Sequence, residues 1–75
     1  MNEKKLVIKN NITKYRIWKN LTRKQLANEI GIAENSLYAI EMKYYYPKYQ
    51  TRKKLCDFFN ISPEQLFYYE NKSHE

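Results

Sequence analysis

Glycine, proline and cysteine are scarce in this sequence, which has one glycine, two prolines and one cysteine among 75 residues. Because so few glycines and prolines leave few obligatory breaks, helices joined by short turns are favoured. One cysteine cannot form an internal disulfide, so a reducing cytoplasm is the expected setting. No apolar run approaches the ~20 residues of a membrane-spanning helix. The first residues, MNEKKLVIKNN, lack the apolar segment of a secretion signal, and we expect none.

Residue types that carry most catalysis and metal binding are also scarce. The chain has one histidine, His74, and one cysteine, Cys56, and it has no glycine-rich phosphate-binding loop. No group of candidate ligands has metal-binding spacing. Cys56 falls at a small apolar position of a predicted helix, which indicates a core residue rather than a reactive thiol. We therefore expect no enzyme activity, metal, cofactor or small-molecule ligand.

Charge of one sign is missing from three long segments. Residues 4–24 hold eight bases and no acid, residues 25–42 hold three acids and no base, and residues 43–54 hold five bases and no acid. Two basic segments thus flank an acidic middle in a chain of net charge +6. This pattern fits a nucleic-acid-binding surface, and it also fits an ordinary solvated surface; charge alone does not decide between them.

Apolar periodicity and capping signals predict five helices. Thr22 with Gln25, and Ser62 with Gln65, have the spacing of capping boxes, while Asn20 suits a left-handed helix terminator. The predicted helices span about 11–19, 22–31, 34–43 and 50–59, with a short final helix that begins at Pro63.

Two β-prone runs lie outside these helices, at residues 5–9 and 66–69. Either they pair as a small terminal sheet, or the N-terminal arm frays and the last helix continues through Tyr69. The expected fold is all-α, with or without this short β pairing. We expect an arm or strand over 1–10, one folded domain over 11–69, and a flexible tail over 70–75.

The run RKQLANEIGIAENSLYAI, residues 23–40, has the pattern of a helix-turn-helix. Ala27 supplies the small residue needed where two steeply crossing helices approach, and Gly31 tolerates the positive φ of the turn between them. Leu37 and Ile40 then hold the second helix against the first. An ordinary helical hairpin is the alternative, but seven matched positions at fixed spacing favour the helix-turn-helix.

With this motif in place, most of the chain resembles the lambda-repressor-like family of phage and bacterial regulators, of the Cro/CI or XRE type. The resemblance covers about residues 11–67, through NNITKYRIWKNLTRKQLANEIGIAENSLYAIE, Pro47 and KKLCDFFNISPEQLF. It implies a five-helix domain that binds operator double-stranded DNA with its third helix in the major groove. Because the family's operators are usually two-fold, it also implies a homodimer.

One face of the third predicted helix lies opposite Leu37 and Ile40 and is the expected base-reading face. Asn35 can pair with adenine, and Glu34 can accept a hydrogen bond from cytosine. The alternative is plain solvent surface, with Glu34 complementing the helix dipole. The expected base-reading residues are Glu34, Asn35, Tyr38, Ala39 and Met42.

Phosphate contacts are expected on both sides of that face. Arg23 and Lys24 oppose the dipole in the first turn of the second helix, a placement that makes sense if an anion docks there. The resemblance implies that this helix end grips a phosphate, and the loop after the third helix adds ammonium and hydroxyl donors. The expected phosphate-binding residues are Thr22, Arg23, Lys24, Ser36, Lys43, Tyr44, Tyr45 and Lys48.

The resemblance further implies a structural ion pair between Arg16 and Glu41. This sequence departs from the family pattern at several positions. Ala33 replaces a Ser or Thr cap, at a cost of about 1 kcal/mol. Lys43 replaces a glycine, so the third helix is free to continue towards Tyr44.

The aromatic and large apolar residues are assigned mostly to the core. Phe58, Phe59, Phe67 and Tyr49 have core spacing. Ile17 and Trp18 are apolar where the family tends to be charged; they either pack over the terminal runs or contact another chain.

The leading hypothesis is a sequence-specific DNA-binding regulator, acting as a repressor and a homodimer, with the terminal runs as candidate dimer contacts. The alternative is a helix-turn-helix that binds another protein, such as polymerase, a recombinase or a toxin partner. The acidic face of the third helix is the best argument for that alternative.

Overall fold

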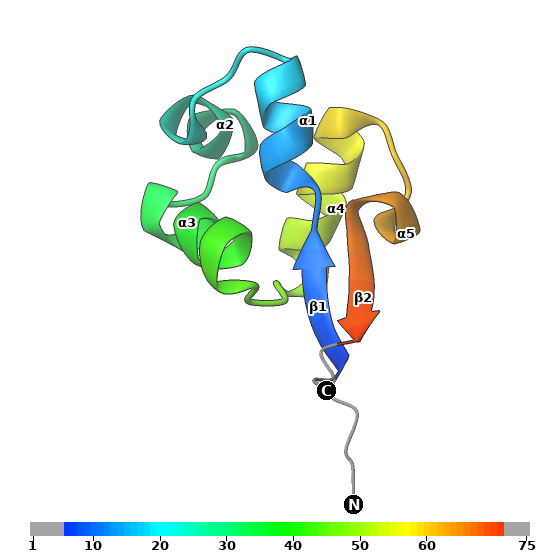
Figure 1. The fold of residues 1–75 in the computed structure, drawn as a ribbon. Helices are drawn as coiled ribbons and strands as arrows, with labels where there is room; N and C mark the ends of the chain where they lie inside the picture. Colours follow the sequence, from blue (N-terminus) through cyan, green and yellow to red (C-terminus); the bar gives the residue numbers. More distant parts are fainter. Residues whose placement is uncertain (1–5, 72–75) are drawn as a thin grey trace, which may run out of the picture.

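The computed structural model describes residues 6–71. Five helices are flanked by two short strands that pair with each other, as Figure 1 shows. The elements are β1 (Leu6–Asn10), α1 (Ile12–Trp18), α2 (Arg23–Ile30), α3 (Glu34–Lys43), α4 (Tyr49–Phe59), α5 (Pro63–Leu66) and β2 (Phe67–Asn71). None of the described helices is long and apolar enough to cross a bilayer.

Local signals set the helix ends where the sequence predicts them. At the start of α2, the Gln25 backbone N–H donates to Thr22 Oγ1 over 3.0 Å, and the Thr22 N–H donates to Gln25 Oε1 over 2.8 Å. Gly31 ends α2 with φ 74°, and Asn20 and Asn60 adopt the same left-handed conformation after α1 and α4. The helix-turn-helix geometry therefore follows from residues close together in the chain.

The core is a single apolar cluster to which every helix contributes. Ala27 is almost fully buried, as expected for the small residue between crossing helices, and Cys56 is a buried core residue. The buried apolar residues are Ile12, Leu26, Ala27, Ile30, Leu37, Ile40, Leu55, Cys56, Phe59, Leu66 and Phe67.

The terminal runs form an antiparallel ribbon, so the pairing alternative is the correct one and the last helix ends at Leu66. The register runs from Leu6 opposite Asn71 to Asn10 opposite Phe67. The ribbon extends away from the helical body (Figure 1). Asn10 ties it to α3, because its side-chain Nδ2 donates to the Ile40 carbonyl over 2.9 Å.

Three expectations about large side chains differ from the structure. Tyr49 is not a core residue: it begins α4 with 64% of its surface exposed. Ile17 and Trp18 do not pack over the terminal runs, since the inward face of α1 is taken by Ile12 and Tyr15. Trp18 is 67% exposed and meets the edge of Tyr15, with ring centroids 5.4 Å apart.

The helix α3 ends at Lys43, and β2 runs into the expected tail. Lys43 is the last residue of α3, and Tyr44 takes the left-handed position after it with φ 56°. The expected tail over 70–75 starts inside β2, which runs to Asn71. Residues 72–75, with His74, and the first five residues of the expected arm lie outside the described part of the chain.

Candidate nucleic-acid interface

The outward ridge of α3 carries side chains that are free to meet a ligand. Leu37, Ile40 and Glu41 are buried, and a helix turns by about 100° per residue, so the ridge opposite them holds Asn35, Ala39 and Met42. Asn35 and Met42 are exposed, and Ala39 is half-buried.

The two flanks of α3 face different neighbours. The same rotation turns Glu34 and Tyr38 towards α2, and it turns Ser36 towards α4. The contacts agree, because the Arg23 guanidinium of α2 lies over the Tyr38 ring, with its Cζ 5.0 Å from the ring centroid. Tyr38 remains 44% exposed, so its other edge is open to a ligand.

Arg23 is less free than the sequence suggests. Its Nη2 lies 3.4 Å from Glu41 Oε1, and only 24% of its side chain is exposed. Its Nε is buried without an acceptor. Lys24, the next residue, is exposed, and Thr22 is exposed although its hydroxyl is used in the α2 cap. Among the described residues at the α2 end of the surface, Lys24 is therefore exposed and Arg23 is tethered to Glu41.

Glu41 is the centre of a buried polar cluster that joins the first three helices. Arg16 donates to its carboxylate through Nε and Nη2, each over 3.1 Å, and the expected pair is present in this form. Thr13 Oγ1 adds a bond of 2.8 Å, and Arg16 Nη1 donates to the Leu21 carbonyl. With Arg23, two guanidiniums share one carboxylate, so the cluster keeps a net positive charge beside α3.

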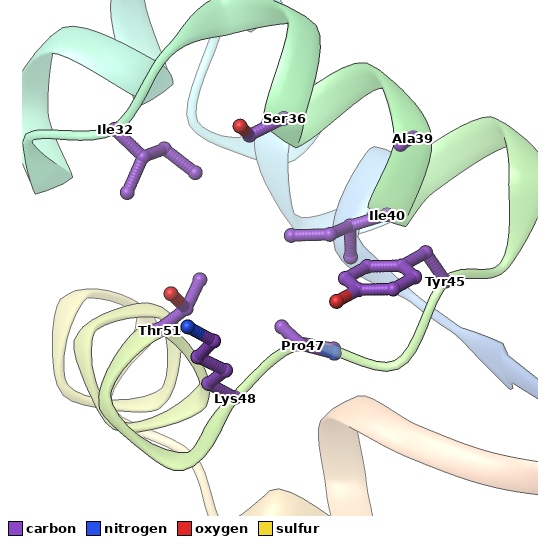
Figure 2. Close-up of a pocket in the computed structure, with 8 residues that line it drawn as sticks. All are labelled: Ile32, Ser36, Ala39, Ile40, Tyr45, Pro47, Lys48 and Thr51. Carbon is purple, nitrogen blue, oxygen red and sulfur yellow. The ribbon is translucent and has the colours of Figure 1, made fainter.

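The other side of α3 borders a groove between that helix, the following loop and α4 (Figure 2). Its volume is about 380 Å³. Figure 2 shows the Lys48 amine and the Thr51 hydroxyl on the α4 side, facing across the groove towards Ser36. The lining residues are Ile32, Ser36, Ala39, Ile40, Tyr45, Pro47, Lys48 and Thr51.

The loop after α3 is held by its own contacts. The Tyr45 N–H donates to the Ala39 carbonyl over 3.2 Å, and the Lys9 amine of β1 lies 5.1 Å from the Tyr44 ring centroid. Lys43, Tyr44, Tyr45 and Lys48 are all exposed, and of these Tyr45 and Lys48 line the groove.

Several residues that build this site carry no strong signal in the sequence. Arg52 of α4 donates from Nη1 to the Pro47 carbonyl over 2.7 Å and lies over the Tyr46 ring, with 4.6 Å to the centroid. Thr13 and Asn10 secure Glu41 and the end of α3. The signal in the sequence that could have identified Arg52 is its place close to a run of tyrosines. The residue spacing gave no indication of Thr13 or Asn10.

The arrangement is thus a narrow outward ridge with donors on both flanks. Arg23 and Lys24 stand at the α2 side, while Lys48, Tyr45 and Ser36 stand at the α4 side. The outward ridge of α3 lies between these two flanks, so one extended ligand could contact the ridge and both flanks together.

A family model described as a helix-turn-helix domain matches residues 10–72. The chain belongs to this helix-turn-helix family, of the XRE type. The match spans α1 to α5 and all of β2, and it includes only the last residue of β1, Asn10.

Comparison with individual proteins agrees with this assignment. The chain is 34% identical over 64 residues to an uncharacterized HTH-type transcriptional regulator of Methanocaldococcus jannaschii, an alignment that covers 85% of this chain and 97% of that protein. A crystal structure of a candidate DNA-binding protein from Bacteroides fragilis superposes with a TM-score of 0.69 at 24% identity, covering 83% of this chain and 100% of that chain. The latter supports the fold alone, and the predicted fold class is confirmed. The helix-turn-helix family is a type of DNA-binding transcriptional regulator rather than an enzyme class.

Proposed function

We propose that this protein is a sequence-specific regulator of transcription that places α3 in the major groove of double-stranded DNA. The observation that carries the proposal is the outward ridge of α3 with donors on both flanks. A helix about 10–12 Å across fits a major groove about 12 Å wide, and the flanking donors then reach the two sugar-phosphate strands. The DNA-binding unit is the domain over 11–69, working in the cytoplasm where its target lies.

The charge of α3 is compatible with this docking. Glu41 is fully buried and paired with Arg16, so its charge does not face the DNA. Glu34 is the exposed acid of α3, and it lies in the first turn, where the helix dipole favours a carboxylate. The exposed Lys43 offsets it at the other end. The net charge presented by α3 is therefore near zero, and the attraction comes from the flanks.

Base reading is assigned to the exposed side chains of the ridge and its α2 flank. Asn35 is exposed in the first turn, where it can donate to and accept from an adenine edge. Glu34 can accept from a cytosine amine, and Ala39 and Met42 can pack against a thymine methyl group. Tyr38 reaches the groove from the α2 side. The proposed set is Glu34, Asn35, Tyr38, Ala39 and Met42.

Backbone binding is assigned to the donors beside the ridge. Lys24 and the free N–H groups of the first turn of α2 face one strand, and Lys48 with the hydroxyls of the groove faces the other. Arg23 adds charge there, although Glu41 holds part of its guanidinium. The proposed set is Thr22, Arg23, Lys24, Ser36, Lys43, Tyr44, Tyr45 and Lys48.

We further propose that the protein acts as a homodimer and a repressor. A single domain of this size makes few base contacts, and a second copy on an adjacent half-site multiplies affinity. The terminal ribbon is the proposed contact, because a two-stranded ribbon is marginally stable alone and gains from added strands. A dimer that spans two half-sites near a promoter would block polymerase by occupancy.

Selection from a library of randomised duplexes tests this function. We expect the full chain to enrich a two-fold sequence, with affinity that falls steeply as salt is added, because phosphate contacts release counterions. Asn35→Ala should relax preference at one or two base pairs, at a cost of about 1–3 kcal/mol on the preferred duplex.

Asn28→Ala is the matched control, because Asn28 is an exposed asparagine on α2 outside the proposed surface. It should leave both affinity and preference unchanged. Equal preference for every sequence in Asn35→Ala and wild type would remove Asn35 from base reading.

Binding to another protein, such as polymerase, a recombinase or a toxin partner, is the second candidate function. Two observations favour it: Glu34 is exposed on α3, and Ile17 and Trp18 form an exposed apolar pair at the end of α1. Failure to bind any duplex at low salt would select this alternative.

A further inference from the structure

The contact between Arg23 and Tyr38 links the first turn of α2 to the proposed base-reading face of α3. The guanidinium Cζ is 5.0 Å from the Tyr38 ring centroid, within the range of a cation–π contact. Tyr38 is 44% exposed, so one side of the ring is covered by Arg23 and the rest is open.

Arg23 is held in this position from its other side. Its Nη2 reaches Glu41 Oε1, and Glu41 is itself fixed by Arg16 and Thr13. A guanidinium that served only to grip phosphate would extend into solvent, where all its donors remain available. Here most of the side chain is buried and the Nε–H faces no acceptor. That loss of hydration is offset by the ring contact and the carboxylate.

An exposed tyrosine on a helix samples several rotamers, and only some of them direct its hydroxyl along the groove. A planar guanidinium that lies over the ring and is anchored to α3 restricts those rotamers. The orientation of the Tyr38 ring then depends on Arg23, although Arg23 itself touches no base. Lysine at this position would keep the charge but lacks the planar group and the fork of donors.

We infer that Arg23 is a positioning residue for base recognition: it orients Tyr38 towards the base-pair edges in the major groove and so helps to set the preferred sequence. The inference rests on the proposed function. It also changes the expected effect of substitutions, because a residue that only binds phosphate alters affinity for all sequences alike.

A measurement without DNA tests the contact itself. The Arg23 guanidinium lies over the Tyr38 ring, with its Cζ 5.0 Å from the centroid, and its Nε is buried. In isotope-labelled protein, the ring current of Tyr38 should therefore displace the NMR resonance of the Arg23 Nε–H proton. Tyr38→Ala should move that resonance, and Lys24→Ala, one residue along the same helix end, should not. An unchanged resonance in Tyr38→Ala would overturn the inference.

Selection from randomised duplexes tests the consequence, with Arg23→Lys, Tyr38→Ala and the double variant compared with wild type. Arg23→Lys should keep the salt dependence of binding but weaken discrimination about two- to fivefold at the base pairs that Tyr38→Ala also affects. The double variant should be no worse than Tyr38→Ala alone, since the two residues act through one contact. Lys24→Ala is the control and should lower affinity without changing preference.

The possible failures are distinguishable. If wild type selects no sequence, the proposed function fails and this inference fails with it. If wild type selects a sequence and Arg23→Lys selects the same one with equal discrimination, only the inference fails. Circular dichroism of each variant should match wild type; a variant that loses helix is replaced by Tyr38→Leu or Arg23→Gln, for which the same loss of discrimination is expected.

Discussion

At the scale of single residues, one carboxylate has the largest structural consequence. Glu41 is fully buried and accepts hydrogen bonds from Thr13, Arg16 and Arg23. Burying a charge is tolerated only when partners satisfy it, and removing one member leaves the others desolvated and unpaired. Three helices therefore depend on the same side chain.

We expect Glu41→Ala to lower the free energy of unfolding by about 3–5 kcal/mol, because two guanidiniums lose their shared partner. Urea denaturation followed by circular dichroism measures this. Asp57→Ala is the control, since it breaks the exposed pair in which Lys53 Nζ lies 3.1 Å from Asp57 Oδ2. That variant should unfold like wild type, and an equally small effect of Glu41→Ala would contradict the role assigned to the cluster.

A second residue, Cys56, gives stability a pH dependence. Burial raises the pKa of its thiol above the ordinary value of 9.0, and the nearby carboxylates of Asp57 and Glu64 act in the same direction. Above that ordinary value the unfolded chain loses the thiol proton while the folded chain keeps it. Stability from this group is thus complete below pH 9.0 and is lost as pH rises further.

We expect the free energy of unfolding to fall between about pH 8 and about pH 10, and to fall less in Cys56→Ala. Urea titrations of both proteins at the two pH values measure the difference. The two proteins differ only at residue 56, so the difference between their pH dependences reports the thiol. Identical pH dependence would show that the thiol titrates the same way in the folded and unfolded chain.

At the scale of elements, α3 begins without a side-chain cap. Its N-cap, Ala33, has an extended backbone with φ −71° and ψ 145°, but no side-chain acceptor for the free N–H groups of the first turn. At the corresponding position of α2, Thr22 supplies that acceptor. The missing cap leaves those N–H groups to solvent or a ligand.

We expect Ala33→Thr to raise the free energy of unfolding by about 1 kcal/mol, because the hydroxyl can accept from the first turn of α3. Ala33→Val is the matched control, since valine has the same shape without the acceptor, and it should give no gain. Thermal or urea unfolding of the three proteins measures the effect. Equal stability of the Thr and Val variants would mean that this helix end needs no cap.

At the scale of the whole molecule, the terminal ribbon leaves backbone groups for a partner strand. The Asn11 N–H donates to the Leu66 carbonyl over 2.9 Å. Bonded pairs alternate along an antiparallel ladder, so Lys9 bonds with Tyr68, whereas Ile8 and Tyr69 direct their N–H groups outward. An added strand on β2 would meet the backbone of Tyr69.

If β2 forms the proposed dimer contact, Tyr69→Pro should convert dimer to monomer, because proline removes the outward donor and leaves the bonds to β1 intact. Sedimentation at several concentrations measures this. Tyr69→Ala is the control for loss of the ring and should remain dimeric. A dimer that survives in Tyr69→Pro would place the contact elsewhere.

Much of the fold could be predicted because its signals are local. The capping boxes at Thr22 and Ser62, the left-handed Gly31 and the apolar spacing of Leu37 and Ile40 act within a few residues, and the structure confirms the helices that they define. The position of the base-reading face on α3 follows from the same spacing and stays a prediction at the level of single residues.

Other features depended on competition between residues far apart in the chain. Spacing showed that Arg23 opens α2, but not that Glu41 and Tyr38 would hold its guanidinium. Core spacing suggested that Tyr49 is buried, yet it is the first residue of α4 and stays 64% exposed.

By itself the sequence determined the helices, their ends and the family, because caps, turns and helical periodicity act between neighbouring residues. Only the tertiary structure decided that the terminal runs pair as a ribbon, that one buried carboxylate serves two arginines, and that Trp18 stays exposed. Each of these features depends on residues that are far apart in the sequence and meet in space. The packing of the helices decides which of them meet.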